Sequence, residues 1–349
     1  MTAAIEITRI RTRVRTERAA LSRRILLVIL ALAVTVVLLF CVSLMLGSVL
    51  LSPAAVVGGL TGTGETATVF VIRELRLPRA TAAVLVGLAL GAAGTLFQRV
   101  LGNPLASPDF LGVAAGAGTA TAAALVLGGV AGVTLPVYAL IGGSVTAVVI
   151  YVVAWHRGVS EYRFILVGIG VGTFATSVTS YLVARAEFAD ARAAMTWLTG
   201  SVGMATPETI TLVAVVLVVL VPSGFALARM LRRLELGDET ARMLGARVER
   251  DRLLILAAGV VLVSVATATV GPIAFISMLA GPLAQILLGA AGRSILAAAL
   301  MGAVILQIAD ILAQHALPWP ISTGVVTGIF GAPYIAWMLI SAARRTRVA

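Results

Sequence analysis

The sequence predicts an all-α polytopic membrane protein with about ten transmembrane helices. Hydrophobic residues make up 60% of its 349 residues and charged residues only 12%, a balance typical of helical membrane proteins. Apolar stretches also run unbroken for about 20 residues, which is the length that crosses a bilayer as a helix. Transmembrane β-strands alternate apolar and polar residues instead, so these long runs exclude a β-barrel.

Ten apolar stretches define the expected spans. They are residues 25–46, 79–98, 112–128, 136–155, 164–185, 208–231, 253–270, 273–288, 295–314 and 323–342. Residues 1–24 form an Arg-rich cytoplasmic tail, residues 25–342 a single transmembrane domain, and residues 343–349 a C-terminal cytoplasmic tail. An even number of spans places both Arg-rich termini on the same side of the membrane.

The formal net charge of +11 follows this topology. All 26 basic residues are Arg, and most of them fall in segments that the ten spans place in the cytoplasm. An excess of positive residues in cytoplasmic loops is the usual orientation signal of membrane proteins. We therefore expect the lipid bilayer as a partner of this chain, and no nucleic acid.

Several kinds of chemistry need residues that this chain lacks. A Walker A loop and a Schiff base both need Lys, so any nucleotide energy must come from another chain. Cys41 is the single cysteine, which excludes an internal disulfide or a cysteine zinc site. His156 and His315 fall on opposite sides of the membrane, which leaves no histidine metal pair. We predict no catalytic residue, no metal site and no cofactor bound by this chain.

The longest charged segment, residues 229–252, cannot lie in hydrocarbon and is predicted to be a cytoplasmic loop. Asp238 can cap a short helix with Glu239 in its first turn, and Gly245 can end that helix in the left-handed conformation. The apolar residues expected to stay exposed on it are Ala241, Met243 and Leu244. A solvated loop needs neither caps nor exposed apolar side chains, so we interpret the segment as a docking site for a soluble partner. The alternative is an ordinary positively charged loop with incidental helicity.

Arg73, Arg76 and Arg79 lie together at the outer end of the second span, against the general charge bias. One interpretation is that their exposed guanidinium groups receive carboxylates of an acidic partner outside the cell. The alternative is that they snorkel to the membrane surface without a partner, with Glu74 neutralising one of them.

Asp310 is the only acid well inside a predicted span. A carboxylate at that depth indicates either a proton or ion site, or a hydrogen-bond acceptor that positions helices. We favour the positioning role because the sequence shows no evident partner carboxylate or histidine for proton transfer.

Glycines recur at helical spacing in two of the predicted spans. In the second span, Gly87, Gly91 and Gly94 indicate close helix packing. In the fifth span, glycines and hydroxyl residues together indicate a thinned, polar helix face that either packs closely or borders a passage through the membrane. The residues of this predicted pathway are Gly168, Gly170, Gly172, Thr173 and Thr176.

Two connections are unusual for a simple bundle. Asn103 and Pro104 begin a tight inside turn, where proline removes a helix donor. The connection between two apolar runs consists of Gly271-Pro272 alone, which predicts a sharp turn or a broken, partly re-entrant helix. Irregular backbone at that depth is tolerated only where protein covers it or water reaches it.

Seven motifs follow one another in a fixed order along the chain. They are Arg76-Leu-Pro-Arg79, Asn103–Gly112, Trp197–Gly200, Leu236–Gly245, Gly271–Phe275, Ala309-Asp310 and Gly324–Tyr334. In this order they resemble the signature of the FecCD family, the membrane subunits of ATP-binding-cassette (ABC) importers for ferric siderophores, haem and cobalamin. The resemblance covers almost everything after the N-terminal tail.

The resemblance implies a permease domain like that of cobalamin importers, with two permease subunits around a pathway that the fifth span helps to line. The second permease is either a copy of this chain or a paralogue. Two ATPase subunits beneath carry ATP and Mg, and a substrate-binding protein above offers glutamates to Arg76 and Arg79. The coupling segment that sits in a cleft of the ATPase comprises Leu236, Gly237, Asp238, Glu239, Ala241, Arg242, Met243, Leu244 and Gly245.

Two positions depart from the family pattern. Many relatives carry an Arg after the Gly-Pro-Ile-x-Phe motif, whereas this chain reads Ala280-Gly-Pro-Leu-Ala-Gln285. Gln314 stands where some relatives have a further outer Arg, so the resemblance places more of the docking on Arg76 and Arg79.

The sequence therefore predicts the permease subunit of an ABC importer in the bacterial cytoplasmic membrane, with ferric siderophores as substrate and iron uptake as the process. A haem or cobalamin importer is the alternative. A secondary transporter is a remote one, because it would need ion- or proton-binding carboxylates. An intramembrane enzyme is disfavoured because no nucleophile–base pair or metal cluster is visible.

Overall fold

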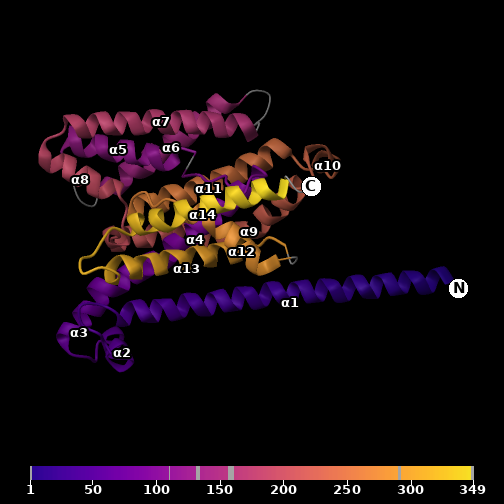
Figure 1. Ribbon diagram of the computed structural model, residues 1–349, viewed down its shortest axis with the longest axis horizontal. Helices are drawn as coiled ribbons and strands as arrows, with labels where there is room; N and C mark the ends of the chain where they lie inside the picture. Colours follow the sequence, from indigo (N-terminus) through magenta and orange to yellow (C-terminus); the bar gives the residue numbers. More distant parts are fainter. Residues whose placement is uncertain (1, 110, 131–133, 156–160, 290–291, 347–349) are drawn as a thin grey trace.

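The computed structural model is helical and has no strand in the residues it describes, which are 2–109, 111–130, 134–155, 161–289 and 292–346 (Figure 1). The predicted all-α class is confirmed. The helices are α1 (Thr2–Met45), α2 (Pro53–Thr61), α3 (Thr66–Phe70), α4 (Leu77–Val100), α5 (Val113–Gly128), α6 (Leu135–Ala154), α7 (Glu161–Arg185), α8 (Phe188–Leu198), α9 (Pro207–Leu234), α10 (Asp238–Met243), α11 (Val248–Val270), α12 (Ile276–Leu288), α13 (Ile295–His315) and α14 (Thr323–Thr346), with a π-helical turn η1 (Val71–Arg76) and a 3₁₀ turn η3 (Val202–Met204).

Each of the ten predicted spans coincides with a helix. Six described helices are long and apolar enough to cross a membrane, at residues 19–45, 66–100, 135–154, 162–185, 248–270 and 295–315. A seventh span is formed if the bent pair Pro207–Leu220 and Ser223–Leu234 counts as one. The other three predicted spans are shorter apolar helices, Val113–Gly128, Ile276–Leu288 and Thr323–Met338, so the number ten is reached only by including them.

The predicted N-terminal tail and first span form one continuous helix of 44 residues, α1. Figure 1 shows α1 along one side of the bundle, with its N-terminal part extending past the other helices. Its apolar part packs against α13, and Leu32 and Val36 are buried in that contact. The Arg-rich segment is thus a helical extension of the first span.

α4 is the central helix of the bundle and packs against α13, α11, α12 and α9. The predicted close packing of this span is confirmed. A Cβ atom at Gly87 would lie 2.5 Å from Cα of Ala303 in α13, and one at Gly91 would overlap the Ala298 carbonyl. Small residues let helix backbones approach in a lipid environment that supplies no hydrophobic force between helices.

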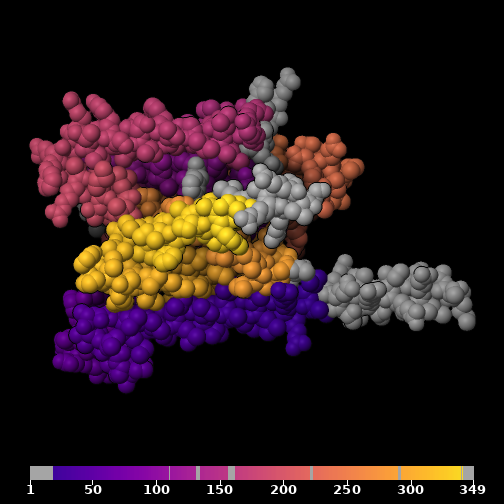
Figure 2. All heavy atoms as spheres, in the orientation of Figure 1, coloured from indigo at the N-terminus to yellow at the C-terminus, as the bar shows by residue number. Residues whose placement is uncertain are grey.

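A second layer made of α5, α6 and α7 covers one side of these central helices (Figure 1). α5 packs against both α6 and α7, while α11 contacts α4 on one side and α5 and α6 on the other. The Thr119 hydroxyl of α5 donates to the Ala175 carbonyl of α7 at 2.8 Å, which ties the two helices together. The outer face of α7 stays uncovered in the single chain, at the upper edge of the molecule in Figure 2.

The predicted break between the seventh and eighth spans is present. α11 ends at Val270, residues 271–275 are irregular, and Phe275 precedes α12 with a left-handed φ of 74°. The backbone N–H of Ser201 donates to the Val270 carbonyl at 2.7 Å, and the Phe275 ring lies against Gly331 of α14. Protein therefore covers this irregular backbone, which is the condition for irregular backbone within the apolar part of a membrane.

The close packing of α4 predicts a large difference between two identical substitutions. Gly91→Ala places a methyl group against the α13 backbone and should destabilise the protein by about 1–3 kcal/mol, the usual range for overpacking. Gly170→Ala, in the middle of α7, meets open space and should be neutral or stabilising by up to about 1 kcal/mol. Thermal unfolding of both purified variants in detergent measures the difference, and equal unfolding temperatures would show that the α4–α13 contact is not tight.

Candidate functional site

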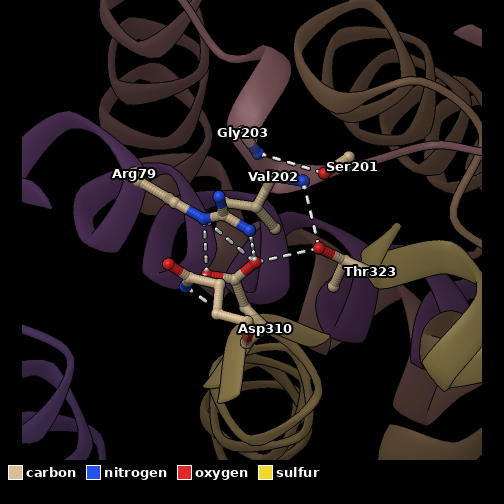
Figure 3. Close-up of polar contacts among 7 residues, drawn as sticks. Arg79, Ser201, Val202, Gly203, Asp310 and Thr323 are labelled. Carbon is tan, nitrogen blue, oxygen red and sulfur yellow. Dashed lines mark hydrogen bonds and ion pairs between the residues drawn. The ribbon is translucent and has the colours of Figure 1, made fainter. Parts of the chain in front are cut away.

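A buried ion pair joins α4 to α13 (Figure 3). Arg79 lies in the first turn of α4, and its Nε and Nη2 atoms donate to Oδ2 and Oδ1 of Asp310 at 3.0 and 2.9 Å. Asp310 is 1% exposed, whereas a quarter of the Arg79 side chain remains exposed. This bidentate contact fixes the directions of both side chains as well as the distance between them.

Further donors complete the surroundings of the Asp310 carboxylate. Thr323 Oγ1 donates to Oδ1 at 2.9 Å and Gln314 Nε2 donates to Oδ2 at 2.8 Å. The Thr323 hydroxyl also accepts from the backbone N–H of Val202 in η3 at 3.3 Å (Figure 3). The carboxylate therefore ties together α4, α13, the start of α14 and η3, which is the geometry expected of a helix-positioning acceptor.

The outer arginines are less free than the sequence suggests. Arg76 donates to the carbonyls of Leu44 and Met45 at 2.8 and 3.0 Å, so it caps the C-terminal end of α1. Arg73 Nη2 donates to the Leu60 carbonyl of α2 at 2.7 Å. Helix C-termini and Asp310 therefore use some of the donors of these three arginines. Docking by Arg76 and Arg79 stays a prediction, limited to the edges of the two groups that remain exposed.

The predicted coupling helix is present as α10, with two corrections. Asp238 is its first helical residue and not its cap; Gly237 occupies the cap position with φ of 88°. Ala241 is fully buried against Ala246 and Val248, so it holds the helix in place and is not part of its exposed surface. Gly245 has the expected left-handed φ of 78°.

The exposed apolar surface of the coupling segment is made by three side chains. Met243 is 80% exposed, and Leu236 and Leu244 are each 56% exposed. The segment itself is fixed to the bundle, since Arg252 of α11 donates to Asp238 at 3.1 Å. A firmly held helix that presents apolar side chains outside the apolar spans has the form of a docking surface.

The sequence did not predict the ion pair that Glu235 makes with Arg99 of α4. Glu235 follows α9, directly before the coupling segment, and its carboxylate receives Nε and Nη2 of Arg99 at 2.9 and 3.2 Å. Arg293, between α12 and α13, lies 3.5 Å from the same carboxylate. Glu235 thereby ties the start of the coupling segment to α4. The sequence carries no signal for this pairing, because 136 positions separate Arg99 and Glu235.

The structure divides the predicted pathway residues of α7 between two faces. Gly168 and Gly172 are buried, and their backbone packs closely on Leu111 and Gly112 at the start of α5. The prediction of one glycine-thinned polar face is therefore wrong. The residues on the exposed face are Gly170, Thr173, Thr176, Ser177 and Ser180. That face carries hydroxyls together with large apolar side chains such as Phe174, and its pathway role stays a prediction.

The turn between α4 and α5 is held by local hydrogen bonds. Asn103 Oδ1 accepts from the Leu105 backbone N–H at 2.9 Å, and Pro104 lies between them. Further along, the Ser107 and Ser277 hydroxyl oxygens lie 2.7 Å apart, and both hydroxyls lie within hydrogen-bond distance of the Asp109 carboxylate, so two protons are shared among three contacts. Burial raises the pKa of the Asp109 carboxyl to about 6, while the two hydroxyl donors act to lower it. Phe110, within this predicted motif, lies outside the described residues.

Within the described ranges, no group of three or more His, Cys, Asp or Glu side chains could hold a metal ion. His315 ends α13 and His156 lies outside the described residues. Cys41 lies exposed on α1, in the apolar part of that helix.

The FecCD transport family model matches residues 34–341. The chain belongs to the FecCD transport family. It is 36% identical to the ferric enterobactin transport system permease protein FepG of Escherichia coli (strain K12) over 325 residues, which cover 93% of this chain and 98% of FepG. It is also 36% identical to the Fe(3+)-citrate import system permease protein YfmE of Bacillus subtilis (strain 168), covering 93% of this chain and 97% of YfmE.

The fold agrees with this family assignment. A solved chain described as an inward-facing, metal-chelate type ABC transporter superposes with a TM-score of 0.78, covering 90% of this chain and 98% of that one at 23% identity. The membership and the apolar helices together show that this is a multi-pass membrane protein of the transport family. Of the two departures from the family pattern, Gln314 turns inward to Asp310, and Gln285 lines a cavity described below.

The ion pair at Asp310 predicts a coupled effect on stability. Asp310→Asn leaves the Arg79 guanidinium without its counter-charge. Breaking a buried ion pair lowers the free energy of unfolding by about 3–5 kcal/mol. Because Arg79 is partly exposed, we expect a loss toward the lower end of this range. The double variant Arg79→Gln with Asp310→Asn should recover about 0.5–3 kcal/mol relative to the sum of the single losses. Thermal unfolding of the purified proteins measures the cycle. Glu239→Gln, at an exposed carboxylate, is the control, and strictly additive losses would contradict the pairing.

Proposed function

We propose that this chain is the transmembrane permease subunit of an ABC importer for ferric siderophores. The observation that carries the proposal is the match along nearly the whole length of FepG and YfmE, whose names specify ferric enterobactin and Fe(3+)-citrate. A third relative, 33% identical over 327 residues, is the iron(3+)-hydroxamate import system permease protein FhuG of Bacillus subtilis (strain 168). Chelated ferric iron is common to these relatives, whereas the chemistry of the chelator differs among them.

The proposed energy source is a separate ATPase subunit that binds ATP and Mg. This chain contains no Lys for a phosphate-binding loop and is proposed to hold no catalytic residue and no cofactor. The ATPase receives the side chains of Leu236, Met243 and Leu244, whose exposure supports this docking. Glu235 then carries a displacement of the segment to α4 through Arg99.

The rest of the assembly follows from the uncovered surfaces of the chain. A second permease, either a copy of this chain or a paralogue, faces the exposed side of α7 and encloses the pathway with it. The charge distribution supports a location in the bacterial cytoplasmic membrane with both termini and α10 in the cytoplasm. A substrate-binding protein docks at the opposite end, near Arg76 and Arg79.

The proposed docking predicts that Met243→Glu abolishes uptake. A carboxylate at this 80% exposed position cannot enter an apolar cleft without a large desolvation cost, while the fold has no reason to change. The measurement is uptake of labelled ferric siderophores by a deletion strain that carries the variant, together with copurification of the ATPase.

Met195→Glu is the matched control, because Met195 on α8 is also exposed and lies outside the proposed interface. Uptake and copurification should be lost for Met243→Glu and kept for Met195→Glu. Full uptake by Met243→Glu would contradict the coupling role, and no uptake of any ferric siderophore by the wild type would contradict the substrate class.

The proposed pathway predicts a pattern of water access along α7. In a Cys41→Ser background, Thr173→Cys and Thr176→Cys should react with a membrane-impermeant maleimide in the assembled transporter, since thiolates form in water and not in hydrocarbon. Ala175→Cys is the control, because Ala175 is buried against α5. Absence of labelling at both Thr positions would show that this face meets lipid or protein.

A further inference from the structure

A cavity of about 190 Å³ lies between α4, α12 and the start of α13, near the loop that follows α4. A single buried water needs only roughly 10–15 Å³ by a comparable measure, so the cavity has room for a larger group. Its polar lining comes mainly from Thr95, Gln98, Arg99, Gln285, Arg293 and Ser294. Gly281 keeps the cavity open on the α12 side, because a Cβ atom there would lie 3.1 Å from Thr95 Oγ1 and would overlap Gln98 Oε1.

Thr95 lacks a partner at this cavity. The residue is 5% exposed, and its Oγ1 atom has no hydrogen-bond partner among the described residues. Several helical Thr hydroxyls in this chain donate to the carbonyl four residues earlier, as Thr121 and Thr269 do. A buried hydroxyl without a partner costs free energy, so a hydrogen-bond acceptor bound in the cavity would stabilise Thr95.

The charges around the cavity favour an anion. Arg99 and Arg293 both line it, and among the described residues Glu235 supplies the carboxylate that contacts them, so this group of three carries a net charge of +1. α13 begins beside the cavity, where the Ser294 hydroxyl accepts from the Ala297 N–H and the Ser294 carbonyl accepts from the Ala298 N–H. The positive end of that helix adds to the two arginines. The C-terminal end of α12 also lies beside the cavity, and Arg24 donates to its Leu287 carbonyl at 3.1 Å, which offsets the negative end of that helix.

We propose that this cavity binds a phosphate group, supplied either by an anionic phospholipid head group or by a soluble phosphate. Arg293, half exposed, and the free edge of Arg99 take the phosphate oxygens. The Thr95 hydroxyl donates to the same phosphate group from the other side of the cavity. Gln98 also lines the cavity, and its Nε2 donates to the Met278 carbonyl at 3.0 Å. Arginine guanidinium groups suit phosphate because they offer paired donors in one plane.

The bound phosphate shares Arg99 and Arg293 with the Glu235 carboxylate and therefore weakens the pairing of Glu235 with both arginines. Glu235 stands at the start of the coupling segment, so occupancy of the cavity loosens the contact that ties this segment to α4. The site would therefore link the lipid or phosphate around the protein to the mobility of the coupling helix. Because both anions bind the same two arginines, removing the negative charge of Glu235 should strengthen phosphate binding.

The test measures binding to the purified full-length permease without any partner. One arm uses nanodiscs of phosphatidylcholine, with or without phosphatidylglycerol, and counts retained anionic lipid by native mass spectrometry. The other arm titrates inorganic phosphate into detergent-solubilised protein and records the shift of the unfolding temperature. The variants are Thr95→Val, Arg293→Gln and Glu235→Gln, and Arg250→Gln, at an exposed arginine near α10, is the control.

Thr95→Val and Arg293→Gln should each weaken binding about tenfold, the effect of losing one hydrogen bond to a charged group. Glu235→Gln should strengthen it by a similar factor, and Arg250→Gln should leave it unchanged. Retention of phosphatidylglycerol alone identifies a lipid head group, and a response to inorganic phosphate alone identifies a soluble phosphate. Binding that is absent in both arms, that falls equally in Arg250→Gln, or that weakens in Glu235→Gln overturns the proposal.

Discussion

The close contact of α4 with α13 and α12 is the constraint on which the rest of the structure depends. Gly87, Gly91 and Gly94 leave no space for a side chain between these helices, so α4 is held at the centre of the bundle as a rigid element. It carries Arg79 near one end and Arg99 near the other, about 30 Å apart along the helix axis. One arginine binds Asp310 and the other binds Glu235. Both of these charged contacts are therefore attached to the same helix.

Each charged contact links α4 to a different part of the machinery. At one end of α4, Asp310 binds Arg79, Gln314 and Thr323, so it sets the relative positions of α4, α13 and α14. At the other end, Glu235 connects α4 to the helix that presents Met243. Ion pairs are directional and expensive to leave unpaired away from water, which makes them suitable for holding helices in one register. In the proposed transporter, a push on α10 reaches the central helix through Glu235 and the outer end through α4.

The sequence predicted the helices well because bilayer-length apolar runs are a strong and local signal, and all ten expected segments coincide with helices. It also predicted α10 from the spacing of Asp238 and Gly245. What it could not predict were contacts between distant positions: Arg79 with Asp310, and Arg99 with Glu235. The fifth span shows the same limit, since the burial of Gly168 and Gly172 depends on where α5 packs and not on their own spacing. Ala241 was misjudged for a related reason, because its partners Ala246 and Val248 lie after a turn.

In the proposed transporter, this chain forms the pathway for the substrate and has no energy source of its own. An ATP-hydrolysing partner moves it through the coupling segment. Reconstitution into liposomes tests this dependence most directly, with accumulation of a labelled ferric siderophore measured for the permease alone and for the complex with its ATPase and binding protein. We expect that the permease alone does not accumulate the siderophore under any ion gradient. The complex should accumulate it only while ATP is hydrolysed. Accumulation against a gradient by the purified chain alone would contradict this dependence.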